Sequence, residues 1–168
     1  MSIRSIVLVA VSALAFTNAE AADQQGPIRD GILGAWTLVS VESVRDDGTK
    51  AEPFGANPKG IIIFSPDGHF SLFQSRADVS KLAANDRTKA TPEEAMAVIA
   101  ATIAYYGTYS VSEAEKVMSV RLEASTFANL VGSEQKRIIT SFTNDELRFT
   151  NPRTPSGVTL HTSWKRAP

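Results

Sequence analysis

Short segments in which apolar and polar residues alternate recur from residue 34 to the C-terminal end of the chain. Side chains of a β-strand point alternately to its two faces, so this period of two predicts strands with one buried face. β-Branched and aromatic residues, which favour strands, are frequent in these segments. The pattern predicts about eight strands: 36–44, 61–65, 69–74, 105–111, 117–123, 135–142, 147–150 and 158–164. That number closes into a small up-and-down antiparallel barrel.

Turns and tryptophans indicate how such a barrel closes. Pro66-Asp67-Gly68 joins two of the segments as a hairpin, and Asn144-Asp145 joins two others. The first segment begins at Trp36 and the last ends at Trp164, and the first and last strands of a closed barrel are neighbours. We therefore assign Trp36 and Trp164 to the closed end of the barrel, with Arg166 covering an indole ring.

One helix interrupts the strands, between the third and the fourth. Thr91 is placed to cap it, Pro92 suits its first position, and Glu94 completes a capping box. From Ala95 to Ala104 the chain carries no charge, so the helix lacks the polar face of a surface helix and we expect most sides to be covered. Three roles stay open: a lid beside a mobile portal at 76–90, a permanent plug, or the contact surface of a homodimer.

The N-terminal segment has the organisation of a secretory signal peptide. Arg4 precedes an apolar run over 6–16, and Ala19 and Ala21 supply the small residues of a cleavage site. We expect cleavage after Ala21 and export to the periplasm or the medium, with no stable membrane anchor. The mature chain is then a mobile segment over 22–32 followed by one barrel domain over 33–166.

Composition excludes several classes of function. The chain has no cysteine, and its net charge of −1 gives no basis for binding nucleic acid. Its two histidines, His69 and His161, lack the spacing of a metal site, so no metal is expected. Neither a nucleophile elbow nor a glycine-rich phosphate loop is present, and we expect no cofactor.

The ordered set of motifs resembles the bacterial and fungal lipocalin-like domain family. The resemblance rests on 34–40, on 53–55 with 60–71, on 105–109, and on 129–132 with 135–137. It implies a compact lipocalin-type barrel with a ligand cavity, and no settled activity. Members of that family often carry a histidine pair where this chain has Val120-Arg121, so no role of those histidines transfers. Unlike true lipocalins, the chain has no helix after its last strand.

Five residues are candidates for binding a ligand. Phe64, Phe70 and Tyr109 occupy expected inward positions, where they would line a cavity or form ordinary core. Arg137 points inward in one register of its strand, where its donors suit a carboxylate or an enol oxygen, and into solvent in the other. Glu42 shares a predicted face with Trp36, as a pocket acid or as a solvated group at the open end of its strand.

These observations favour an exported protein that binds a small apolar or aromatic molecule inside the barrel. One alternative is a cofactor-independent isomerase or cyclase that uses Glu42, Tyr109 or Arg137 to polarise a substrate in the same cavity. Another is a structural or interaction module with a filled barrel. No motif marks the chain as an enzyme. We expect a ligand to lie away from the tryptophans, towards the helix and the 76–90 loop.

Overall fold

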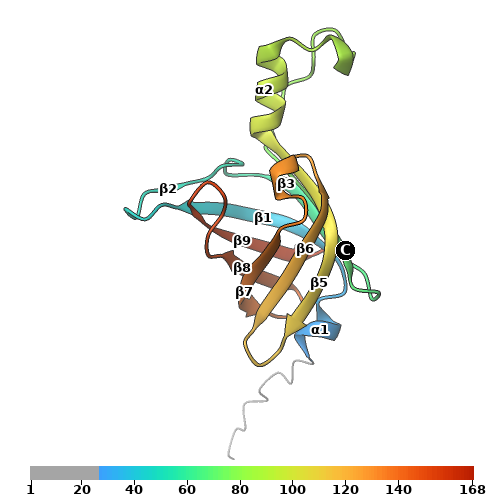
Figure 1. The fold of residues 1–168 in the computed structure, drawn as a ribbon, viewed down its shortest axis with the longest axis vertical. Helices are drawn as coiled ribbons and strands as arrows, with labels where there is room; N and C mark the ends of the chain where they lie inside the picture. Colours follow the sequence, from blue (N-terminus) through green and yellow to red (C-terminus); the bar gives the residue numbers. More distant parts are fainter. Residues whose placement is uncertain (1–26) are drawn as a thin grey trace, which may run out of the picture.

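Eight antiparallel strands close into a barrel in the computed structural model, which describes residues 27–168 (Figure 1). β1 pairs with β3, each strand from β3 to β8 pairs with the next along the chain, and β9 pairs back with β1, so the barrel is closed. The two-residue β2 is a ninth strand that pairs with the end of β1 outside this closed ladder. The strands are β1 (Gly34–Val44), β2 (Lys50–Ala51), β3 (Lys59–Phe64), β4 (His69–Ser75), β5 (Thr102–Ser112), β6 (Val117–Ser125), β7 (Glu134–Phe142), β8 (Glu146–Asn151) and β9 (Thr159–Arg166). This confirms the predicted up-and-down barrel.

The N-terminal end of the described chain closes the base of the barrel. The signal peptide predicted over 1–21 lies outside the described residues, as does the stretch 22–26. The short helix α1 (Ile28–Gly31) follows, with the Glu113 carboxylate accepting hydrogen bonds from the amides of Ile28 and Arg29. Ile32 is fully buried, so packing against the barrel begins before residue 33.

The pairing of β1 with β9 is fixed at the base by an arginine and two tryptophans. Trp36 lies opposite Arg166 in the ladder, and Leu38 opposite Trp164. The Arg166 guanidinium lies 4.1 Å from the Trp36 ring centroid and donates hydrogen bonds to three backbone carbonyls, those of Gly31, Leu33 and Asn144. Both indoles are fully buried, and each N–H donates to an oxygen. The base is therefore a filled, hydrogen-bonded end.

A β-bulge in β1 reverses which face its residues present. The pairing with β9 steps from Leu38 directly to Ser40, so Val39 is the extra residue. Trp36 and Leu38 point inward before the bulge, and Val41 is the next buried residue after it. Glu42 therefore faces outward, and the expectation that it shares the face of Trp36 was wrong. A prediction from strict alternation assumes that a strand has no extra residue, and no turn residue in this segment indicates the bulge.

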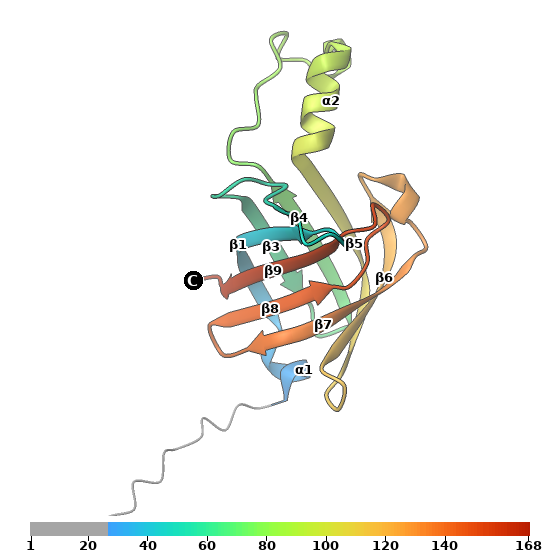
Figure 2. The same cartoon turned by 90° about the vertical axis from the view of Figure 1, so that its left-hand side faces the viewer.

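The helix α2 (Pro92–Ala101) begins as predicted and stands away from the barrel (Figure 2). The Thr91 hydroxyl accepts from the amide of Glu94, whose carboxylate accepts from the amide of Thr91. Met96 and Ile99 are 62% and 67% exposed, so the expectation that the chain covers this helix on most sides was wrong. The helix is not a plug, and the homodimer through its uncharged surface stays a prediction.

Two 3-10 helices complete the fold. The first, η1 (Arg87–Lys89), lies in the long segment between β4 and α2, and the second, η2 (Ala128–Leu130), lies between β6 and β7. None of the helices within residues 27–168 has the length and apolar character needed to cross a membrane.

A close backbone approach at Gly107 yields a test of the fold. A β-carbon on Gly107 would lie 1.9 Å from the carbonyl oxygen of Arg121 on β6, beside the β5–β6 bulge. We expect Gly107→Ala to lower the free energy of unfolding by about 1–3 kcal/mol, because the two backbones must separate. Urea unfolding would measure it, with the exposed Ser110→Ala on the same strand as control. Equal stability of the two variants would contradict the close approach.

Candidate functional site

A cavity of about 750 Å³ opens at the end of the barrel opposite the tryptophans. Its rim includes Ser43 at the end of β1, Phe54, Leu130 of η2 and the loop between β8 and β9. Apolar side chains make up much of its wall: Leu72, Ile103, Phe149 and Leu160. The segment 76–101, which contains α2, emerges at this same end of the barrel, but none of its residues lines the cavity.

Arg137 is placed inside the barrel by the register of β7. It pairs with Met118 of β6, and along β7 the buried positions are Arg137 and Ile139, with Gln135 half-buried on the same face. The arginine side chain is 0% exposed and lines the cavity. Of the two registers that the sequence left open, the structure has the inward one.

The Arg137 guanidinium has one hydrogen-bond partner and three aromatic neighbours. Its Nη2 donates to the Tyr105 hydroxyl at 2.9 Å, whereas Nε and Nη1 are buried without a partner. Its central carbon lies 5.8, 5.5 and 5.2 Å from the ring centroids of Phe70, Tyr105 and Phe149. No carboxylate within residues 27–168 forms an ion pair with it. A permanent cation thus faces the cavity with unused donors.

The three predicted aromatic residues form a column of packed rings below the cavity, in which Phe64 stacks on Phe70 and meets Tyr109 edge to face. Phe64 packs against Tyr109 at a centroid distance of 4.9 Å and against Phe70 at 6.2 Å. The Tyr109 hydroxyl donates to the carbonyl of Ser65, and burial raises the pKa of this phenol. Neither Phe64 nor Tyr109 lines the cavity, and Phe70 reaches the site through the ring that it presents to Arg137.

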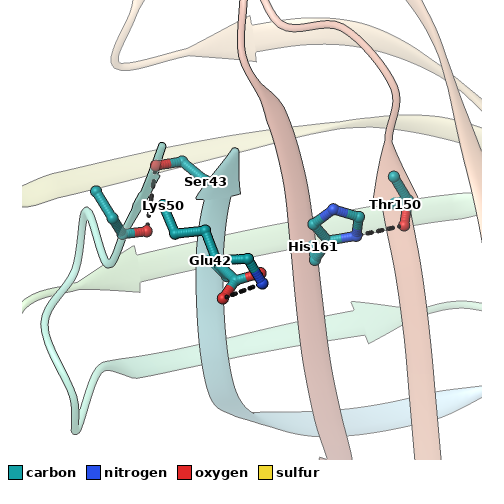
Figure 3. Close-up of polar contacts among 6 residues, drawn as sticks. Glu42, Ser43, Lys50, Thr150 and His161 are labelled. Atoms are coloured by element: carbon teal, nitrogen blue, oxygen red, sulfur yellow. Dashed lines mark hydrogen bonds and ion pairs between the residues drawn. The ribbon is translucent and has the colours of Figure 1, made fainter. Parts of the chain in front are cut away.

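Glu42 and the two histidines lie outside the cavity. Figure 3 shows Glu42 directed towards Lys50, whose Nζ lies 3.0 Å from its carboxylate. His161 lies on β9, the strand beside β1; it is exposed, and its Nδ1 lies 2.9 Å from the Thr150 hydroxyl. His69 contacts Asp67 in the hairpin turn between β3 and β4. Across residues 27–168, no three acidic or histidine side chains form a group that could bind a metal ion. The acid predicted for the cavity is thus a surface group.

Tyr105, Phe149 and Asn151 belong to the site but were not predicted. The Tyr105 hydroxyl accepts a hydrogen bond from Arg137. The shared parity of Tyr105 and Tyr109 on one strand is a signal that could have found it. Asn151 lines the cavity with its Oδ1 buried and unpaired, and no pattern in the sequence announces it.

A closed eight-stranded barrel, filled at one end and hollow at the other, defines a lipocalin-type architecture. The profile of the lipocalin-like domain matches residues 33–167, which is most of the described chain. The chain belongs to this lipocalin-like domain family, as the motifs had suggested.

Comparison with solved structures finds designed barrels. The redesigned β-barrel b11L5F_LGL is 12% identical, with a TM-score of 0.44 over 84% of this chain and 96% of the design. The redesigned barrel mFAP1, solved bound to DFHBI, is 14% identical, with a TM-score of 0.44 over 84% of this chain and 100% of the design. No curated protein matches the chain.

Arg137 inside the barrel and Arg166 at its base should respond oppositely to the same substitution. We expect Arg137→Met to raise the free energy of unfolding by about 1 kcal/mol or more, because it removes a buried charge that has no counter-ion. Arg166→Met should lower it by about 2 kcal/mol or more, since it removes charge-assisted hydrogen bonds and an indole contact. Urea unfolding of both variants is the measurement. Equal destabilisation would show that Arg137 is a structural support.

Proposed function

We propose that this protein binds a small, largely apolar or aromatic molecule inside its barrel. The observation that carries the proposal is the open cavity of about 750 Å³, within the range of about 300–1,000 Å³ that is usual for ligand sites. Apolar side chains make up much of its wall, and among its polar groups Arg137 and Tyr105 lie in hydrogen-bond contact. Such a combination binds an apolar body and fixes its orientation.

Binding is better supported than the two alternatives. Of Glu42, Tyr109 and Arg137, the groups considered for an isomerase or cyclase, only Arg137 lines the cavity. An arginine stays protonated, so it can polarise an oxygen but cannot serve as a general base. A structural module with a filled barrel would not need the cavity. The geometry therefore supports a binding protein.

We also propose that the protein acts after export. The support lies in the sequence alone: the apolar run over 6–16 and the small residues Ala19 and Ala21 have the order found in signal peptides. Exported proteins are often stabilised by disulfides, which this chain cannot form because it has no cysteine. The hydrophobic core of the closed barrel stabilises the fold instead.

A bulky side chain that fills the cavity should weaken binding of a small apolar molecule. Ile103 lines the cavity wall on β5, whereas Ile61 is an exposed residue of the outer face of β3. We expect Ile103→Trp to weaken binding of the neutral fluorophore N-phenyl-1-naphthylamine at least tenfold, because the indole takes the space of the ligand. Fluorescence titration would measure it, with Ile61→Trp as the matched control at wild-type affinity. Equal affinities of the two variants would place binding elsewhere, and failure of the wild type to bind this fluorophore or any other small apolar or aromatic probe would refute the proposal.

A further inference from the structure

We propose that the ligand is an organic monoanion, an apolar or aromatic body with one carboxylate or equivalent oxyanion, and that the anion pairs with Arg137. This inference rests on the proposed function and names the chemical class of the molecule that the cavity takes. It follows from the partners that the arginine lacks, the charge of the interior and the charges at the cavity mouth.

The first step is the unmet hydrogen bonding of Arg137. A guanidinium has five N–H donors and keeps its charge at every physiological pH. Only Nη2 has a partner, the neutral hydroxyl of Tyr105, and both Nε and Nη1 are buried with none. Buried polar groups in folded proteins are otherwise nearly always satisfied. A carboxylate supplies two acceptor oxygens and is the group that best fits a guanidinium.

The second step is charge. Water could accept the free N–H groups, but a neutral molecule would leave the cation uncompensated. The faces of Phe70, Tyr105 and Phe149 attract a cation, although more weakly than an anion does in a site of low dielectric constant. Arg137 is the one charged side chain among the buried residues of 27–168. A ligand with a single negative charge would therefore compensate the charge of the interior.

The third step is the charge at the mouth. Arg45, which follows β1, and Arg153, in the loop between β8 and β9, are exposed and line the opening. Glu134 is the only carboxylate residue among those that line the cavity, and its Oε1 lies 3.0 Å from Nη1 of Arg121. Cations at an opening raise the local concentration of anions and speed their entry. The mouth and the interior thus favour the same sign of ligand.

Two pairs of probes that differ in charge test the inference. Isothermal titration calorimetry at neutral pH would compare laurate with dodecanol, and 2-naphthoate with 2-naphthylmethanol, on the wild-type protein. We expect each carboxylate to bind at least tenfold more tightly than its alcohol, as a charge-assisted hydrogen bond allows. In Arg137→Met this preference for the carboxylate over its alcohol should vanish, and Arg137→Lys should retain a reduced preference. Circular dichroism would establish that each variant is folded.

The outcomes separate this inference from the proposed function. If both members of each pair bind and the carboxylate is not preferred, the inference that the ligand is an anion is refuted. The proposed function, binding of a small molecule in the cavity, would still be supported. A carboxylate preference that survives in Arg137→Met, or in Arg137→Gln should the methionine variant not fold, would also overturn the inference. It would place the anion at Arg45 and Arg153 instead. Absence of binding by all four probes and by the neutral fluorophore would refute the proposed function itself.

Discussion

The antiparallel pairing of β1 with β9 is the constraint on which the rest of the structure depends. An open sheet of this length would expose two edges of unpaired N–H and C=O groups, and the closed ladder removes them. Closure also creates an inside. Side chains on the inward face of every strand then share one enclosed volume, so each residue is either core or cavity wall. The contact of Arg166 with Trp36 fixes this pairing at the base, where β1 begins and β9 ends.

Closure determines how the interior is divided. Large indoles and the ring column of Phe64, Phe70 and Tyr109 fill the base and the middle of the barrel. The opposite end carries smaller or more polar inward groups, Gln135 and Ser43 among them, and it stays hollow. The filled base supplies the core burial that stabilises the fold, which leaves the open end free to keep a cavity. The core burial and the cavity thus lie in different halves of one barrel.

Much of this arrangement can be predicted from the sequence. Alternation and turn residues predict the strands, the two tryptophans indicate which end is closed, and Thr91 with Glu94 locates the start of α2. Alternation does not predict which residues face inward after a bulge. The extra residue Val39 is enough to move Glu42 from the inside to the surface. The exposure of α2 was missed for another reason: a run without charge indicates burial only where another surface is present to cover it.

Arg137 shows why the site itself escaped full prediction. An arginine in a strand is usually solvated, and nothing within β7 distinguishes the inward register from the outward one. The inward orientation follows from the pairing of β7 with β6 and β8, which lie outside the segment that carries Arg137. Within residues 27–168, Arg137 is the one buried charged side chain, and its charge has no counter-ion there, so folding alone gives no reason to keep it inside. An uncompensated buried cation that faces a cavity departs from consistent core packing, and such departures are typical of functional sites.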